Sequence, residues 1–221
     1  MSASADDGDA GLRARLRARL AGSRPSTPEE ATLAGLPLEV TARYRHLMPV
    51  DATAAAVLIP LIDHADGLTV LLTERASDLR HHPGQISFPG GRLEADDDGP
   101  VAAALRETEE EIGLARRYVE VLGYLPDHII LTGYRVTPIV ALVHPGVALT
   151  VDPTEVASVF EVPLAFVLDP RNHRVRRRPI GKEHVDVYDL PFGGHNIWGA
   201  TAGMLITLSR LLEPSSGRTA G

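Results

Sequence analysis

Three glutamates, Glu107, Glu110 and Glu111, are the residues whose type and spacing point most directly to chemistry. At 100° per residue they gather on one side of a helix. Their carboxylates repel one another by roughly 0.2–0.5 kcal/mol per i,i+4 pair, and each opposes the negative end of the helix dipole by about 0.3–1 kcal/mol. A hard divalent cation reverses the sign of both effects, because carboxylate oxygens are the ligands that Mg²⁺ or Mn²⁺ binds. An acidic run alone favours the alternative, a solvated acidic helix face. The defined helix ends, the preceding Pro-Gly-Gly and the Arg106-Glu107 pair favour a metal site instead.

The neighbouring residues define the ends of this helix. Gly99 suits the N-cap, and Pro100 suits the first helical position, where its missing N–H would be unpaired anyway. Gly113 suits the left-handed residue that follows a last turn. The face predicted to be buried carries apolar side chains and one threonine, namely Val101, Ala104, Leu105, Thr108 and Ile112.

Two glycines, Gly90 and Gly91, lie upstream of the helix. Glycine lets backbone approach a ligand closely and exposes N–H groups to anions. A Gly-Gly turn alone is weak support, but beside a carboxylate helix it adds to the prediction of a ligand site. Arg106 lies off the carboxylate face, and we expect it to orient a glutamate or a loop carboxylate rather than touch substrate.

The stretch from Gly90 to Leu114 resembles the signature of Nudix hydrolases, which is Gly, five residues, Glu, seven residues, then R-E-U-x-E-E-x-G-U with U apolar. The matching positions are Arg106, Glu107, Glu110, Glu111, Gly113 and Leu114, with Thr108 at an apolar position. Counted from Gly91, the loop is one residue longer than the pattern, and Asp98 replaces the family's loop glutamate. The resemblance implies Glu107 and Glu111 as principal metal ligands and Glu110 as a third ligand or water-mediated partner.

The residues upstream of this stretch resemble one branch of the family, the coenzyme A pyrophosphatases. That branch carries L-L-T-x-R-S/A, then spaced R and G, then F-P-G-G; here these are Leu71–Ala76, Arg80, Gly84 and Phe88–Gly91. The resemblance continues through residues 131–138 and 198–203. It implies metal-dependent hydrolysis of coenzyme A or its thioesters to 3′,5′-ADP and 4′-phosphopantetheine.

Within that interpretation, Arg75, Arg80, Gly90 and Gly91 are candidate substrate contacts, although each arginine could equally be a surface ion pair. The general base stays open among a glutamate of the signature, Glu155 and a metal-bound hydroxide. Two other functions also stay open: a pyrophosphatase for another nucleoside-diphosphate conjugate such as ADP-ribose, and a non-catalytic nucleotide-sensing protein. The sequence does not choose between Mg²⁺ and Mn²⁺, and it leaves the preferred acyl form undecided.

Composition limits the class of protein. The 221-residue chain carries a net charge of −7 and no cysteine, which argues against non-specific nucleic-acid binding and excludes disulfides and thiolate sites. No apolar run approaches the roughly 20 residues of a membrane span, and the acidic N-terminus is unlike a secretory signal. We expect a cytoplasmic protein with one domain over 45–214, a flexible N-terminal tail with a short amphipathic helix over 1–30, and a flexible tail over 215–221. The oligomeric state stays open.

The elements expected around the site form an α/β arrangement, a Nudix-like α/β/α sandwich around a mixed β-sheet. The predicted strands are 52–62, its hairpin partner 68–73, and then 85–88, 119–125, 136–143, 151–160 and, last, 184–190. Short and closing helices are expected at 164–168 and 197–212, and a loop over the site at 126–134.

Two further segments have alternative interpretations. Residues 11–22 are predicted to form a helix whose leucines dock on the domain rather than bind a membrane surface. The basic block 171–178 is predicted to be an exposed strand that uses charge to discourage edge pairing, with nucleic-acid or 3′-phosphate binding as alternatives.

Overall fold

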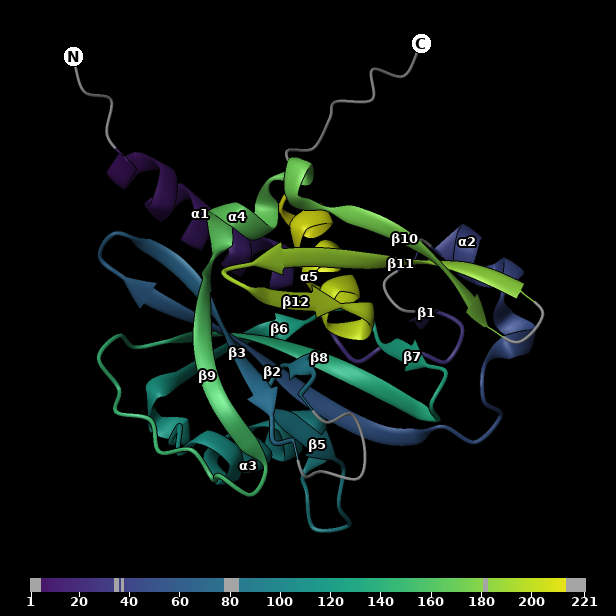
Figure 1. Cartoon of the computed structure of the whole chain (residues 1–221). Helices are drawn as coiled ribbons and strands as arrows, with labels where there is room; N and C mark the ends of the chain where they lie inside the picture. The colour runs from purple at the N-terminus through teal and green to yellow at the C-terminus, as the bar shows by residue number, and fades with distance from the viewer. Residues whose placement is uncertain (1–4, 34–35, 37, 78–83, 181–182, 214–221) are drawn as a thin grey trace.

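The computed structural model describes residues 5–33, 36, 38–77, 84–180 and 183–213. A mixed β-sheet forms its centre (Figure 1), and within the described residues this sheet has nine strands in the order β1-β7-β8-β2-β3-β4, with β5 beside β2, β6 beside β8 and β9 beside β3. The strands are β1 (Thr32–Leu33), β2 (Thr53–His64), β3 (Gly67–Arg75), β4 (Ile86–Ser87), β5 (Gly90–Arg92), β6 (Val119–Tyr124), β7 (His128–Ile130), β8 (Tyr134–Val143) and β9 (Val156–Pro163).

Strand β2 is central because it pairs with three other strands. It runs parallel to β8, antiparallel to β3 through the 64–67 turn, and antiparallel to β5 through Ala56↔Gly91. Most of its residues from Ala55 to Leu61 are buried, which confirms the predicted strand covered on both faces. Because β5 pairs directly with this strand, the Gly90–Gly91 turn is fixed to the middle of the sheet.

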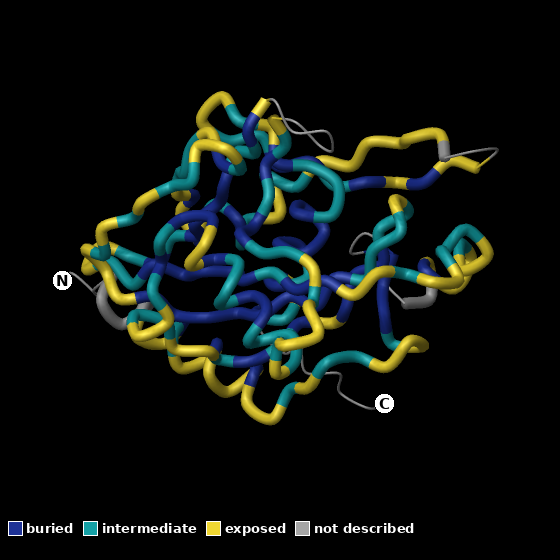
Figure 2. The backbone as a smooth tube through the Cα atoms, turned by 90° about the horizontal axis from the view of Figure 1, so that it is seen from below, coloured by how far each residue is buried: buried dark blue, intermediate teal, exposed yellow. Residues whose placement is uncertain are grey.

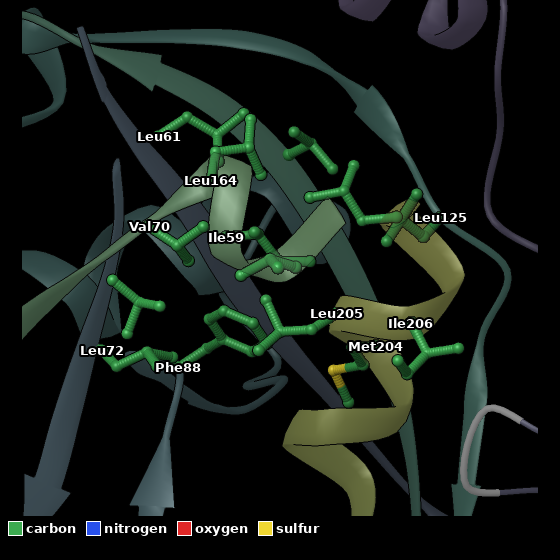
Figure 3. Packing of buried hydrophobic residues seen from close by; sticks show 14 of the residues in the cluster. Ile59, Leu61, Val70, Leu72, Phe88, Leu125, Leu164, Met204, Leu205 and Ile206 are labelled. Atoms are coloured by element: carbon green, nitrogen blue, oxygen red, sulfur yellow. The ribbon is translucent and has the colours of Figure 1, made fainter. Parts of the chain in front are cut away.

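Helices cover both faces of the sheet, as the sequence predicted. The helices are α1 (Ala5–Leu20), α2 (Leu38–Arg43), α3 (Gly99–Ile112), α4 (Leu164–Leu168) and α5 (Gly199–Leu212), with 3₁₀ turns at Arg45–Leu47, Arg116–Tyr118 and Pro170–Asn172. Helix α3 packs on one face through Ala103, Ala104 and Ile112. Helices α1, α4 and α5 pack on the other face, where the larger apolar cluster lies. Figure 3 shows the part of this cluster that involves α4 and α5. The buried strands run through the middle of the molecule and exposed loops surround them (Figure 2).

Helix α1 docks on the domain through the predicted leucine stripe. Leu12, Leu16 and Leu20 are all buried. Arg13 forms an ion pair with Asp63, and its Nε–Oδ1 distance is 2.6 Å. The helix begins at Ala5, six residues before its predicted start. Docking therefore accounts for the apolar stripe without a membrane.

A second sheet, β10 (Arg174–Ile180), β11 (Glu183–Phe192) and β12 (His195–Trp198), packs on α5. The basic block supplies β10, whose residues 174–179 are exposed. Among the described strands, β10 pairs with β11 alone. This confirms the predicted exposed strand. The prediction that 184–190 is the last strand is wrong, because Ile197 and Trp198 extend β12 instead of opening the closing helix.

Two predicted boundaries in the central sheet are also corrected. The segment 126–134, predicted as a loop, contains β7, which pairs with β8 and with β1. The strand predicted over 151–160 begins only at Val156, because the Asp152 carboxylate accepts a hydrogen bond from the Thr154 N–H at 2.8 Å and holds a turn there.

Candidate active site

Helix α3 carries the three glutamates and has well-defined ends. The N-cap is Asp98, one residue before the predicted Gly99, and Pro100 lies in the first turn. Gly113 adopts the predicted left-handed conformation with φ of 69°, and its N–H donates to the Glu109 carbonyl at 3.0 Å. A side chain there would also crowd Thr150, whose backbone N and O lie 3.0 Å from an added Cβ. The helix therefore ends directly after Glu111 and Ile112.

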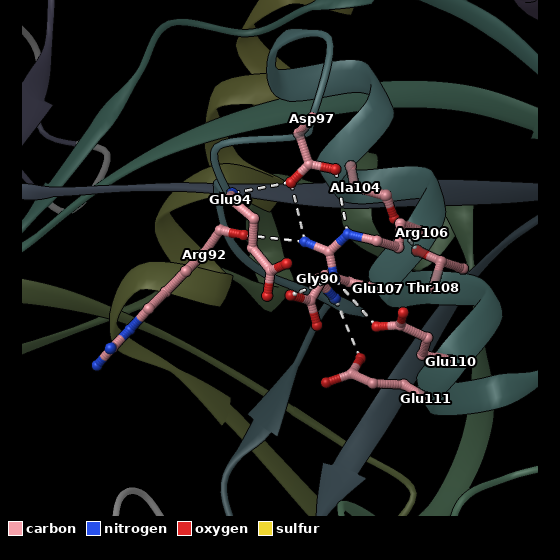
Figure 4. Close-up of polar contacts among 10 residues, drawn as sticks. All are labelled: Gly90, Arg92, Glu94, Asp97, Ala104, Arg106, Glu107, Thr108, Glu110 and Glu111. Atoms are coloured by element: carbon pink, nitrogen blue, oxygen red, sulfur yellow. Dashed lines mark hydrogen bonds and ion pairs between the residues drawn. The ribbon is translucent and has the colours of Figure 1, made fainter.

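The Gly90–Gly91 turn closes against the carboxylates of α3 (Figure 4). The Gly90 N–H donates to Glu111 Oε2 at 3.1 Å. An added Cβ on Gly91 would lie 2.4 Å from Glu107 Cδ and 2.5 and 2.7 Å from its two oxygens. Close approach to the Glu107 carboxylate therefore requires glycine at position 91, whereas position 90 requires glycine because φ is 144° and an added Cβ would lie 2.3 Å from the Ala56 carbonyl oxygen.

Burial perturbs the two innermost carboxylates. The side chain of Glu111 is 3% exposed, and this burial, opposed by the Gly90 N–H and the charge of Arg75, raises its pKa to about 7. Burial also raises the pKa of Glu107, although the Arg106 guanidinium opposes the shift. The negative charge of Glu155 pushes both pKa values in the same upward direction. A cation placed here would favour ionised Glu107 and Glu111.

Arg106 is the centre of the polar network shown in Figure 4. Its Nε and Nη2 donate to the two oxygens of Asp97 at 3.1 and 2.9 Å. Its Nη1 donates to Glu107 at 3.1 Å and to Glu110 at 3.0 Å, and Nη2 also meets the Arg92 carbonyl at 3.3 Å. The hydrogen bond from Arg106 lowers the pKa of Asp97. Arg106 therefore orients carboxylates, as predicted from its place on the helix.

The loop carboxylate in this network differs from the one matched by the sequence pattern. The pattern places Asp98 at the position of the family's loop glutamate. In the structure Asp97 instead accepts two hydrogen bonds from the Arg106 guanidinium, and it also accepts one from the Glu94 N–H at 2.9 Å. Asp97 is the residue reached by counting forward from Gly91. The extra residue of the loop therefore lies between Asp97 and the helix, which a count backward from Arg106 does not reveal.

Arg75 and Glu155 reach the site from adjoining strand ends. Arg75 ends β3 and is paired in register with Val156, and the next residue, Ala76, donates its N–H to the Glu155 carbonyl at 2.9 Å. The positive charge of Arg75 lowers the pKa of Glu111, and the negative charge of Glu155 raises it. Arg80, the other predicted substrate contact, lies outside the described residues.

The donor set suits a hard divalent cation. Glu107 and Glu111 present carboxylate oxygens from one helix face, Glu155 adds a third charge, and the desolvation of Glu111 is a cost that a cation would offset. Glu110 is exposed and bonded to Arg106, so its role as a ligand stays a prediction. In the described part of the chain, no three Asp, Glu or His side chains are already gathered closely enough to hold a metal, so ligation requires the carboxylates to turn toward the ion.

Comparison with known proteins identifies the family. Residues 52–183 match the NUDIX domain. The chain belongs to the Nudix family. The match lies inside the 45–214 domain expected from the sequence.

Two relatives carry the name Uncharacterized Nudix hydrolase NudL. The protein from Photorhabdus laumondii is 43% identical over 162 residues, covering 72% of this chain and 84% of its own. The protein from Enterobacter sp. strain 638 is 40% identical over 156 residues, covering 70% and 80%. Among solved structures, a C. elegans Ap4A hydrolase binary complex is 19% identical, with a TM-score of 0.44 and coverage of 50% of this chain and 80% of that one.

As a Nudix hydrolase, the chain hydrolyses nucleoside diphosphate-linked substrates, a reaction for which the family generally uses divalent cations. No helix among the described residues is long and apolar enough to cross a membrane. The sequence analysis missed one residue of the site, Asp97, for which the acidic run Asp96–Asp98 was a signal. It also missed a pair beside the site, in which Arg92 Nη2 donates to the Tyr134 hydroxyl at 2.7 Å, because no local pattern joins these two residues.

Proposed function

We propose that this Nudix hydrolase cleaves the diphosphate bond of coenzyme A or its thioesters, giving 3′,5′-ADP and 4′-phosphopantetheine or its acyl form. One observation supports the proposal above the others. The upstream residues that resemble the coenzyme A branch converge on the carboxylate site, since Arg75 ends β3 with its charge acting on Glu111 and Gly90 donates to the same carboxylate. Their place beside these carboxylates supports the proposal that they bind the substrate diphosphate.

In the proposed reaction, water adds across the P–O–P bridge: one phosphorus gains the water oxygen and the other keeps the bridging oxygen. Glu107 and Glu111 are the proposed principal ligands, with Glu110 as a third ligand or a water-mediated partner. A bound Mg²⁺ or Mn²⁺ would neutralise diphosphate charge and lower the pKa of water. Arg75 would bind a diphosphate oxygen by charge-assisted hydrogen bonds.

Arg106 has a positioning role in this proposal. It holds Glu107 and Glu110 from one side and Asp97 from the other, so that the carboxylates keep their orientation while substrate is absent. Glu155 is the proposed general base. Its negative charge raises the pKa of both Glu107 and Glu111, and it lies just before β9 rather than on the helix that carries the proposed ligands.

The test is a substrate panel. The protein is incubated with Mg²⁺ or Mn²⁺ and with coenzyme A, acetyl-coenzyme A, ADP-ribose, NADH or UDP-glucose, and products are identified by mass. Release of 3′,5′-ADP from coenzyme A, with the other compounds slow, is the expected result. Preference for ADP-ribose would refute the coenzyme A assignment and keep the metal chemistry, and binding without turnover would favour a nucleotide sensor.

Paired variants test the ligand assignment. Glu111→Gln is expected to abolish turnover while the protein stays folded, as judged by melting temperature. Glu109→Gln is the matched control, because Glu109 is an exposed glutamate on the same helix. Its carboxylate lies 4.0 Å from Arg116 and forms no hydrogen bond or ion pair with the described site residues. Full activity of Glu111→Gln would remove Glu111 from the ligand set.

A further inference from the structure

Arg92 is an exposed cation held in place at the edge of the site. Its Nη2 donates to the Tyr134 hydroxyl at 2.7 Å and its Nε to the same oxygen at 3.3 Å. The guanidinium carbon also lies 5.5 Å from the centre of the Tyr134 ring. The two residues are 42 positions apart in the chain, so this contact is a product of the fold and not of local sequence.

The strands around this pair fix both residues. Arg92 is paired with Ala55 on β2, and Tyr134 is paired with Thr53 on the same strand. The next residue, Arg135, donates to the Asp127 carboxylate at 2.6 Å, which anchors the start of β8. Much of the entropy of ordering an arginine is therefore already lost before a ligand binds, and a preorganised group binds more tightly for that reason.

Arg92 has no carboxylate partner within ion-pair distance among the residues that the structure describes, although its neighbour in the site, Arg106, has three. The Tyr134 hydroxyl accepts hydrogen bonds from only some of the five N–H donors of the Arg92 guanidinium. In Figure 4 the Arg92 side chain extends away from Glu107 and Glu111, while its backbone carbonyl remains bonded to Arg106. The cation is thus beside the diphosphate site but separate from it.

We propose that Arg92, positioned by Tyr134, binds a phosphomonoester that the substrate carries outside its diphosphate. The identity of that group rests on the proposed function: in coenzyme A it is the ribose 3′-phosphate, which is attached close to the diphosphate. An arginine fork matches phosphate oxygens in geometry and charge. Arg92 thereby selects coenzyme A over its dephospho form, whereas the metal ligands act on both.

The basic strand β10 is the rival location for this phosphate, but much of its charge is already engaged. Arg176 forms an ion pair with the buried Asp189 at 2.7 Å. Arg178 lies over the Trp198 ring at 5.4 Å. Arg177 is exposed, and among the described residues it forms no ion pair and lies over no aromatic ring. It is therefore a suitable control for a cation on the competing surface.

The experiment measures binding of 3′,5′-ADP and of 5′-AMP by calorimetry, with no bond to hydrolyse. Wild-type protein is expected to prefer 3′,5′-ADP, and Arg92→Gln to lose about tenfold to hundredfold of its affinity for 3′,5′-ADP alone, as for one charge-assisted contact. Tyr134→Phe is expected to lose less, Arg92→Lys to restore part of the preference, and Arg177→Gln to change nothing.

Turnover gives a second measurement. Arg92→Gln is expected to raise KM for coenzyme A with kcat nearly unchanged, and to leave dephospho-coenzyme A unaffected. Equal effects on both substrates, or loss of the 3′,5′-ADP preference in Arg177→Gln instead, would overturn the inference. If wild-type protein leaves coenzyme A intact while its 3′,5′-ADP preference still depends on Arg92, the proposed function fails and the phosphate site stands.

Discussion

Gly91→Ala tests the carboxylate site by moving one side chain while the backbone stays in place. The added Cβ would lie 2.4–2.7 Å from the Glu107 carboxylate atoms, whereas non-bonded carbons rest at about 3.5–4.0 Å. The carboxylate therefore has to move by about 1 Å. Misplacement of a catalytic group by that distance costs on the order of 10²-fold in rate, and we expect a loss of this size in kcat for any substrate of the enzyme.

The fold is expected to survive this substitution. Gly91 is not in the left-handed region, and its closest contacts are all with the far end of a flexible side chain. Replacing such a glycine by alanine stabilises proteins by about 0.4–1 kcal/mol through the unfolded state, which offsets part of the crowding. Gly90→Ala is the contrasting variant, because φ is 144° and its Cβ would lie 2.3 Å from the Ala56 carbonyl oxygen; it is expected to lose melting temperature together with activity.

The assay combines three measurements on Gly91→Ala: kcat with the best substrate, Mn²⁺ affinity by titration, and melting temperature. In a Glu107→Gln background the same substitution is expected to add little, because both changes act through one carboxylate. Wild-type turnover and Mn²⁺ affinity in Gly91→Ala would refute the role of Glu107. A loss that simply adds to that of Glu107→Gln would show that Gly91 acts by another route.

Three further predictions concern stability and positioning. Burial lowers the pKa of His128 from 6.5 to about 4, so the contribution of neutral His128 to stability is complete above pH 6.5 and is lost as pH falls toward 4. His128→Gln is expected to remove about 3 kcal/mol of this acid sensitivity, measured by denaturant titrations across that pH range. Leu16→Ala should lower the free energy of unfolding by about 2–5 kcal/mol if α1 is part of the core, and an unchanged value would contradict docking. Asp97→Asn should lower kcat by roughly 10–100-fold with little change in melting temperature, because it releases Arg106, and wild-type kcat would refute that role.

Helix α3 and the buried strands could be predicted because their signals are local. The spacing of Ala104, Thr108 and Ile112 gives the buried face, and Gly113 marks the end. The same local reasoning failed for β7, because Pro126 and Gly133 suggest a connection and the strand between them is short. Its pairing with both β8 and β1 is a tertiary effect that overrides the turn signals.

The candidate site was predictable in its helix and less so in its loops. The glutamates and glycines follow from spacing, whereas the choice between Asp97 and Asp98 depends on where a loop residue is inserted, which only the Arg106 contacts show. The pairing of Arg92 with Tyr134 joins two strands that both lie beside β2. Contacts of this kind depend on the register of the sheet, and sequence spacing carries no information about it.

The structure also shows how the chain tolerates three clustered glutamates. Arg106 contacts Glu107 and Glu110 directly, and this offsets much of the repulsion expected from the sequence. It makes no such contact with Glu111, which is buried in the last turn with one N–H donor, from Gly90, and the field of Arg75. One arginine thus compensates two of the carboxylates, and Glu111 remains the least compensated of the three helix glutamates. That difference favours Glu111 over Glu110 as the ligand on which cation binding depends most.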